Sequence, residues 1–282
     1  MQVIPTITAL RAALAAAHAG GRAIGLVPTM GALHAGHASL VERCIRENEI
    51  SVVSVFVNPT QFNDPTDLAT YPRTLEADCR LLEQLGADYV FAPTAQEMYP
   101  EPDTRVFAYP PTDTVMEGAS RPGHFNGVCQ VVSKLFEIVE PTRAYFGEKD
   151  YQQVAVVRRM VADKGYPLTI VACPIVREAD GLALSSRNSL FSPDERAAAP
   201  AIARTLSQSR DYAKEHTLSD TRQWVTDQVD AVNGLRVQYY EIVDGRSLQA
   251  LSAWEDSPQP VGCIAVFCGQ RPVRLIDNIQ YR

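Results

Sequence analysis

The residues with the clearest chemical potential lie in one short segment, PTMGALHAGH, at residues 28–37. An apolar run precedes this segment and apolar residues at helical spacing follow it, so we predict a turn between a buried strand and a helix. The start of a helix offers unpaired N–H groups and a partial positive charge, which favour an anion. Gly31 and Gly36 let the backbone approach a ligand closely, and the imidazoles of His34 and His37 can donate to phosphate oxygens. The segment is therefore predicted to bind phosphate.

Other interpretations of the two histidines stay open on the sequence alone. They could ligate zinc, although no Cys, Asp or Glu flanks them at ligand spacing and the chain has no H-E-x-x-H. They could also be ordinary surface or helix-capping residues. A P-loop is excluded, because Leu26 and Val27 follow the glycine pair Gly20 and Gly25 where Lys and Ser or Thr are required. The chain also lacks G-x-G-x-x-G, the dinucleotide-binding fingerprint.

Polar residues follow a second predicted strand. The β-branched run at residues 50–57 is predicted to be a central parallel strand, and Asn58 and Gln61 come directly after it. Parallel strands usually meet ligands at their carboxyl ends. Because Asn58-Pro59 could equally form a simple turn, Asn58 and Gln61 are candidate ligand-binding residues and no more.

A strand, a glycine and a new helix recur at residues 143–153. Gly147 would allow close approach, and Lys149 offers a cation for phosphate where the helix begins. Asp150 is the expected N-cap, and Gln153 would complete a D-x-x-Q capping box. Gln153 therefore has two open interpretations, as a helix cap and as a ligand.

Two loop-like segments carry further polar groups. Ser185, Ser186 and Arg187 offer two hydroxyls and a guanidinium fork, which suit a triphosphate, or they could form a surface loop before a helix. Residues 97–125 are rich in Pro and Gly, and a loop of this length is usually functional or mobile, so it is a candidate lid. Near its end, Arg121 could serve a ligand or lie in a solvated turn.

These motifs resemble a known family. HAGH at residues 34–37 resembles the H-x-G-H element of the adenylyl-transferring nucleotidyltransferase superfamily. The longer string PTMGALHAGH, followed in order by FVNPTQF, FGEKDYQQ and LSSRN, is similar to the pantoate–β-alanine ligase family in particular. The blocks extend from residue 28 to residue 188. H-x-G-H alone would be a weak signal, whereas four ordered blocks are specific.

The resemblance implies a reaction. (R)-Pantoate would condense with β-alanine at the expense of ATP through a pantoyl-adenylate intermediate, with release of AMP and pyrophosphate. ATP would be a substrate, and Mg²⁺ would accompany it largely through phosphates and water. His34, His37, Lys149 and Arg187 would be the catalytic residues, and His37 matches the family's proton donor.

The resemblance also implies the binding residues. Gln61 would contact both pantoate and β-alanine, Gln153 would hold pantoate, and Asn58 would join them. Arg121 would lie in a flap over the substrates, near the phosphates. Asp78 is a candidate Mg²⁺ ligand, although Ala77 precedes it where some relatives have a second acid. The ATP-binding set would be Met30, Gly31, His34, Gly36, His37, Gly147, Lys149, Asp150, Val176, Leu184, Ser185, Ser186 and Arg187.

Composition limits the partners and the compartment. The 282 residues carry a net charge of −7 with no basic stripe, which disfavours nucleic acid as a partner. No apolar run could cross a membrane, and the first 21 residues lack the basic start of a signal peptide. Six scattered cysteines without C-x-x-C indicate reduced, buried thiols. We therefore expect a cytoplasmic protein, and from the resemblance a homodimer.

The periodicities predict an α/β fold. A Rossmann-like parallel sheet with helices on both faces is expected over residues 1–176, as the nucleotide- and pantoate-binding domain. A smaller α+β domain that closes over the ATP site is expected over residues 177–282. Within these domains we expect one helix at 71–85, with Leu75 buried, and one continuous helix from Pro193 to about Glu215.

Two rival functions remain on the sequence. The chain could be another adenylyltransferase or a cytidylyltransferase of the same superfamily, although Gln61 and Gln153 favour a small hydroxy acid as substrate. It could also be a non-catalytic nucleotide-binding module. A binding module would not release pyrophosphate from ATP, and that observation separates the two classes.

Overall fold

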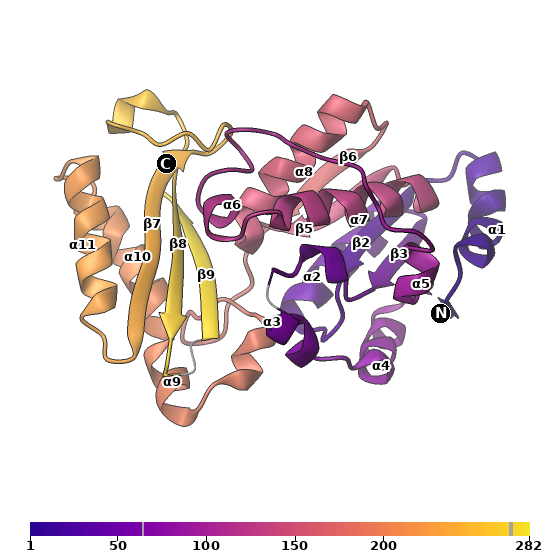
Figure 1. Cartoon of the computed structure of the whole chain (residues 1–282), viewed down its shortest axis with the longest axis horizontal. Coiled ribbons are helices and arrows are strands. Elements are labelled where there is room, and N and C mark those ends of the chain that lie inside the picture. Colours follow the sequence, from indigo (N-terminus) through magenta and orange to yellow (C-terminus); the bar gives the residue numbers. More distant parts are fainter. Residues whose placement is uncertain (64, 271–272) are drawn as a thin grey trace. The chain divides into compact units, whose positions relative to one another are not determined.

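The computed structural model describes residues 1–63, 65–270 and 273–282. By packing, the chain divides into two compact units. Unit 1 comprises Met1–Glu148 and Val156–Pro174, and unit 2 comprises Lys149–Ala155 and Ile175–Arg282. Figure 1 shows the elements of both. The assignment of binding roles to residues 1–176 and 177–282 stays a prediction.

Unit 1 is built on a parallel sheet of six strands. The strand order is β1-β4-β3-β2-β5-β6, and every recorded pairing is parallel. Strand β3 is buried at every position except its last, serines included, because both faces of the sheet are covered. The strands are β1 (Gln2–Ile4), β2 (Ile24–Thr29), β3 (Ile50–Val55), β4 (Tyr89–Phe91), β5 (Arg143–Gly147) and β6 (Thr169–Cys173).

Helices cover both faces of this sheet, which confirms the predicted fold class. Helices α2 and α4 pack over one face, where a core forms around Val27, Val41 and Leu82. Helices α1 and α7 contact each other, and α7 also contacts β2. The helices of unit 1 are α1 (Ile7–Ala19), α2 (Ala35–Glu47), α3 (Pro65–Thr70), α4 (Leu75–Leu85), α5 (Ala95–Met98), α6 (Glu117–Ser120), α7 (His124–Val139) and most of α8 (Tyr151–Lys164), with a 3₁₀ turn, η1 (Pro59–Gln61).

Helix α4 corrects one expectation. It begins at Leu75 rather than at Tyr71, and Pro72 lies between α3 and this start. Leu75 is 44% exposed instead of buried. The buried stripe of α4 runs through Asp78 and Leu82, so the first position of the helix faces away from the core. The prediction failed because it placed Leu75 inside the periodic stripe.

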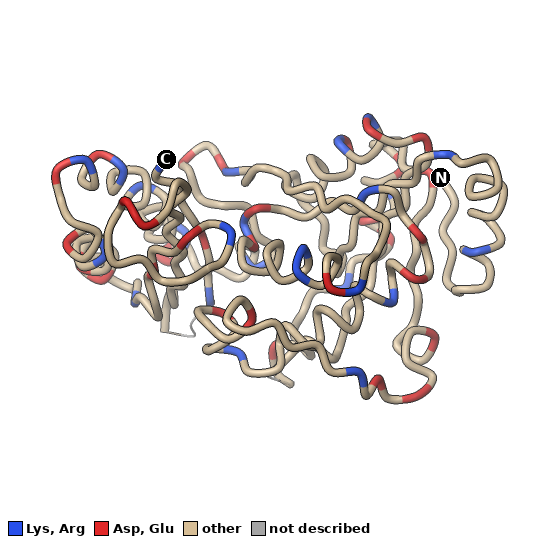
Figure 2. The backbone as a smooth tube through the Cα atoms, turned by 90° about the horizontal axis from the view of Figure 1, so that it is seen from above, with Lys and Arg blue, Asp and Glu red and all other residues tan. Residues whose placement is uncertain are grey.

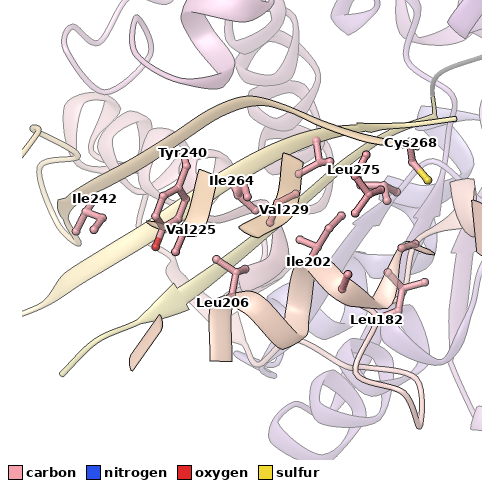
Figure 3. Close-up of a cluster of buried hydrophobic side chains, with 14 of the residues drawn as sticks. Leu182, Ile202, Leu206, Val225, Val229, Tyr240, Ile242, Ile264, Cys268 and Leu275 are labelled. Carbon is pink, nitrogen blue, oxygen red and sulfur yellow. The ribbon is translucent and has the colours of Figure 1, made fainter. Parts of the chain in front are cut away.

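Unit 2 contains the antiparallel sheet β7-β8-β9, with β7 (Leu235–Asp244), β8 (Pro260–Cys268) and β9 (Val273–Gln280). Helices α10 (Pro200–Tyr212) and α11 (Leu218–Asp230) pack on it, and Figure 1 shows both beside the same sheet. Figure 3 shows the apolar core between these helices and the sheet. Leu182, from the loop before the helices, also lies in this core. The predicted α+β class of this part is confirmed.

The expected helix from Pro193 to Glu215 is interrupted. It forms α9 (Pro193–Ala198) and α10, which begins at Pro200. A proline inside a helix removes one backbone donor and clashes with the preceding turn, so it serves instead as the first residue of a new helix. The start at Pro193 is as predicted, and Ser192 and Glu195 form a capping box in front of it.

The charged residues and the cysteines lie as the sequence predicted, with no basic stripe along the described chain (Figure 2) and with the thiols reduced. Figure 2 shows basic and acidic positions interspersed along the described chain. All six cysteines are free thiols, and five of them are buried. Among the described residues, no helix has the length and apolarity needed to span a membrane.

Candidate active site

Three neighbouring strands bring polar segments to one edge of the sheet in unit 1. Strand β2 lies between β3 and β5, and all three run parallel. Their carboxyl ends therefore share an edge, where the histidine turn follows β2, Asn58 and Gln61 follow β3, and Gly147 ends β5. From β2 the chain continues to β3 on one side of it, and from β4 it crosses back to β5 on the other side of β2. The strand order reverses at β2, so the carboxyl ends of β2 and β5 mark the topological switch point of the sheet.

The two histidines cap α2, whose N-cap is His34. The His34 Nδ1 accepts from the backbone N–H of Gly36 at 3.1 Å, and the His37 Nδ1 accepts from the backbone N–H of His34 at 3.3 Å. The rings lie close, with centroids 4.1 Å apart. Because each Nδ1 accepts, each neutral ring carries its proton on Nε2. The capping interpretation is thus correct in part, and the neutral form of each ring has its N–H donor at Nε2, at the start of α2.

Asp78 supports the turn that carries the histidines. Its carboxylate is 2% exposed and accepts from the backbone N–H groups of Ala32 at 3.1 Å and Leu33 at 2.8 Å. Thr74 donates its hydroxyl to the same carboxylate at 3.2 Å. Gly31 has a φ of +80°, and a Cβ there would lie 2.9 Å from an Asp78 oxygen. Asp78 on α4 therefore fixes the backbone of the turn.

The contacts of Asp78 bear on its predicted role at Mg²⁺. Both oxygens already accept hydrogen bonds within the protein, and the group is almost fully buried. Across the part of the chain that the structure describes, no group of three or more His, Cys, Asp or Glu side chains could hold a metal ion. The donor set thus does not suit a protein-bound Mg²⁺ at Asp78.

Asn58 is fully engaged within the protein and orients Gln61. The Asn58 side chain is 1% exposed and donates through Nδ2 to the Gly127 carbonyl at 3.2 Å. A carbonyl can only accept, so this bond fixes which end of the Asn58 amide is nitrogen. Nδ2 also donates to Gln61 Oε1 at 3.1 Å, and Tyr99 donates its hydroxyl to Asn58 Oδ1 at 2.8 Å. Gln61 is thereby left with its Nε2–H₂ as the end that can donate to a ligand.

His124 also lies among these residues, although no motif predicted a role for it. It is 7% exposed, and its Nδ1 lies 2.9 Å from the Gln61 carbonyl oxygen, so Nδ1 is the donor. Its Nε2 then accepts from Arg121 at 3.2 Å. Arg121 also lies 3.8 Å from the Glu117 carboxylate. The structure thus brings Arg121 and Gln61 together through one imidazole; the only sequence signal was that His124 follows Arg121 closely.

The expected lid, residues 97–125, is tied to α7. Gln130 of α7 donates to the carbonyls of Asp103 at 2.9 Å and Arg105 at 2.8 Å. Phe107 is buried, and its N–H donates to Asn126 at 2.8 Å. These contacts hold residues 103–107, so motion of the whole loop stays a prediction.

In unit 2, Lys149 and Asp150 lie in a 3₁₀ turn, η2 (Glu148–Asp150), that leads directly into α8. The Lys149 Nζ lies 3.7 Å from an Asp150 carboxylate oxygen. Among the described residues, no hydrogen bond joins Asp150 or Gln153 to the start of α8, so the expected capping box does not form. The physical reason is that Asp150 sits in a 3₁₀ turn rather than in the extended conformation of an N-cap.

The predicted phosphate residues of unit 2 follow a hairpin. Arg177 and Ala183 form an antiparallel bridge, and the N–H of Leu184 donates to the Val176 carbonyl at 3.0 Å. The next element is a 3₁₀ helix, η3 (Ser186–Leu190), which Ser185 caps by accepting from the Arg187 N–H at 3.3 Å. Ser185, Ser186 and Arg187 are thus placed on one short, capped segment.

The buried thiols do not offer a covalent nucleophile. Burial raises the pKa of Cys44 to about 12, and burial likewise raises the pKa of Cys129 to about 12. Both thiols therefore stay protonated near neutral pH. The chemistry that the site residues suit is displacement at phosphorus, assisted by hydrogen-bond donors and positive charge.

The fold and the turn define a class: a Rossmann-like α/β protein with an anion-binding turn at the switch point of its parallel sheet. A family model described as pantoate-beta-alanine ligase matches residues 2–280. The chain belongs to this family, and it is an enzyme of the ligase type.

Individual relatives agree along the whole chain. A pantothenate synthetase of Bacteroides thetaiotaomicron is 64% identical over 282 residues, which cover 100% of this chain and 99% of that protein. The crystal structure of a Thermus thermophilus pantothenate synthetase has a TM-score of 0.93 at 47% identity, with 100% and 99% coverage. The Francisella tularensis pantoate-beta-alanine ligase complexed with beta-gamma ATP and beta-alanine has a TM-score of 0.83 at 35% identity, with 100% and 98% coverage.

Proposed function

We propose that this enzyme condenses (R)-pantoate with β-alanine through a pantoyl-adenylate intermediate, and that it releases pyrophosphate and then AMP. The observation that carries this proposal is the turn at residues 30–37. It combines a helix N-terminus with two Nε2–H donors, those of His34 and His37, at the switch point of a parallel sheet. Family membership supplies the substrates.

In the first step, a carboxylate oxygen of pantoate attacks the α-phosphorus of ATP. A new P–O bond forms, the bond to the β-phosphate bridge breaks, and pyrophosphate leaves. Negative charge grows on the leaving group and on the α-phosphate oxygens, and nearby donors lower the barrier by stabilising that charge. His34, His37, Lys149, Ser185, Ser186 and Arg187 are the donors that we assign to this task.

In the second step, the amine of β-alanine attacks the acyl carbon of the adenylate. The amide C–N bond forms, the acyl C–O bond breaks, AMP leaves with that oxygen, and the amine loses a proton. A mixed anhydride hydrolyses readily, so this site has to exclude water while the intermediate waits.

The amide of Gln61 supports a carboxylate or hydroxyl substrate. Asn58 donates to Oε1 of Gln61, so the Nε2–H₂ group of Gln61 is the end that can donate to a substrate. Donors suit the oxygens of pantoate, and a pre-oriented amide loses little freedom when it binds. We assign Gln61 and Gln153 to substrate binding, and Asn58 to the orientation of Gln61.

Three finer points belong to the same proposal. Mg²⁺ would be held by ATP phosphates and water, because the contacts of Asp78 are already committed within the protein. The cytoplasmic compartment is supported by the six free thiols. A homodimer is expected from the resemblance, and light scattering in solution would test it.

Lys149→Ala tests the assignment of phosphate donors. We expect kcat/KM for pyrophosphate release to fall by ~10²-fold or more, since one charged donor to the transition state is lost. The melting temperature should change little. The matched control is Lys214→Ala, which removes a 72%-exposed lysine of unit 2 and should leave turnover as it is. Near-normal turnover of Lys149→Ala would contradict the assignment.

A further inference from the structure

The start of α8 is attached to unit 2 by two long-range hydrogen bonds. Asn278 of β9 donates its Nδ2 to the carbonyl of Lys149 at 3.2 Å. Tyr151 donates its hydroxyl to the carbonyl of Gly245 at 2.9 Å. A Cβ on Gly245 would lie 2.8 Å from that hydroxyl, so the glycine permits the approach. Asn278 is 6% exposed, which makes the loss of its bond costly.

The neighbouring residue of β9 holds the other phosphate-binding segment. Asp277 is 6% exposed and receives a two-pronged pair from Arg177, with N–O distances of 2.7 and 2.9 Å. Arg177 also donates to the Gly181 carbonyl at 3.1 Å, inside the hairpin that leads to Ser185. A bidentate Arg–carboxylate pair fixes orientation as well as distance.

One strand therefore holds both segments. Strand β9 is paired with β8 from Val273 to Gln280, so its backbone is fixed. Asp277 and Asn278 are consecutive, and the backbone N–H of Asn278 donates to the Asp277 carboxylate at 2.8 Å, which fixes that carboxylate against the backbone of β9. The hairpin is fixed further by Leu182, which lies in the core of unit 2.

We propose that Asp277 and Asn278 are positioning residues that hold Lys149 in register with Ser185–Arg187, so that these donors meet the triphosphate as one set. This inference rests on the proposed function of Lys149. Donors that are already in place bind and stabilise charge without reorganising. The β9 pair would thus act on ATP through Lys149 and not by contact with it.

A double-mutant cycle tests the proposal. The variants are Asn278→Ala, Lys149→Ala and the pair together, and the measurement is the Kd of ATP by titration calorimetry. We expect Asn278→Ala alone to weaken ATP binding about three- to tenfold, in line with the loss of one buried hydrogen bond. In the Lys149→Ala background the same change should weaken binding by less than about twofold, because the residue that it positions is gone.

Two further variants keep the test decisive. Thr221→Val removes another buried hydrogen bond to a carbonyl of unit 2, and it should lower the melting temperature without changing the Kd. If Asn278→Ala does not fold, Tyr151→Phe removes the second attachment and should show the same dependence on Lys149. If Asn278→Ala weakens ATP binding equally with Lys149 present and in the Lys149→Ala variant, or weakens it in neither case, this inference is overturned and the role of Lys149 is not. If Lys149→Ala binds ATP with the same Kd as the unmodified enzyme, Lys149 does not bind ATP, and this inference is overturned as well.

Discussion

Among single residues, His34 and His37 support the fold through Nδ1, and we propose that they serve the ligand through Nε2. Nδ1 satisfies backbone N–H groups of the first turn of α2, which would otherwise lack partners. That bond also fixes the proton of the neutral ring on Nε2. An Asp could cap the helix equally well but carries no donor, and a Ser has a single oxygen atom for both tasks, whereas a neutral imidazole accepts at one nitrogen and donates at the other.

Gln153 provides a residue-scale prediction. The capping box expected at this position does not form among the described residues, so the ligand interpretation is favoured. Gln153→Ala should raise the KM for pantoate by about tenfold or more, because a donor to the substrate is lost. The melting temperature should hardly move.

Its neighbour offers the control. Gln152 is 5% exposed, and Gln152→Ala should lower the free energy of unfolding by about 1 kcal/mol with a normal pantoate KM. If Gln153→Ala lowers stability and leaves the pantoate KM unchanged, the ligand interpretation is wrong.

At the scale of elements, the turn after β2 depends on α4. Asp78→Asn keeps the size of the side chain but replaces one of two accepting oxygens with a donor, which faces a backbone N–H. We expect the free energy of unfolding to fall by about 2 kcal/mol and the KM for ATP to rise. The Mg²⁺ concentration that gives half-maximal rate should be unchanged at saturating ATP. A raised Mg²⁺ requirement would instead make Asp78 a metal ligand.

The turn that follows β7 gives a pH prediction. Burial of Asp244 opposes ionisation, but hydrogen bonds from Ser257, Ser247 and the Arg246 N–H outweigh it and lower the pKa to about 2. A lowered pKa in the folded state adds stability that is present above the ordinary value near 3.8 and is lost as the pH falls toward 2. This turn contains Gly245, which Tyr151 contacts.

Asp244→Asn should therefore lower the free energy of unfolding by about 2 kcal/mol at pH 7. The difference in the free energy of unfolding between this variant and the unmodified protein should shrink as the pH falls from 4 to 2. Thermal unfolding at pH 7, 4 and 2.5 would measure it. A difference that stays constant with pH would show that the charge of Asp244 does not contribute.

Across the whole molecule, the features that the sequence predicted correctly are those set by residues close together in the chain. The strand predicted at 50–57, which forms at Ile50–Val55, and the helix start at Pro193 both depend on residues within a few positions of each other. The same is true of the H-x-G-H turn, whose caps lie three residues apart. The fold class followed from these elements and from their order.

The parts that could not be predicted depend on distant contacts. Asp78 reaches the turn across 46 positions, and His124 reaches the Gln61 carbonyl across 63. Asn278 reaches Lys149 across 129. No periodicity or motif links such pairs, so the supports of the site emerge only when the chain is folded. The support that Asp78 gives to the histidine turn is one such contact, and its role at Mg²⁺ stays a prediction.

The proposed reaction depends on the pantoyl adenylate, and isotope labelling detects whether it forms. Pantoate with ¹⁸O in its carboxylate is incubated with the enzyme, ATP and Mg²⁺, and β-alanine is added last. We expect pyrophosphate release of up to about one equivalent per site before β-alanine is added, because a shielded intermediate stays bound. After β-alanine is added, AMP should carry ¹⁸O from pantoate and none from labelled water. ADP as the nucleotide product, or AMP without the label, would show that the reaction does not pass through a pantoyl adenylate.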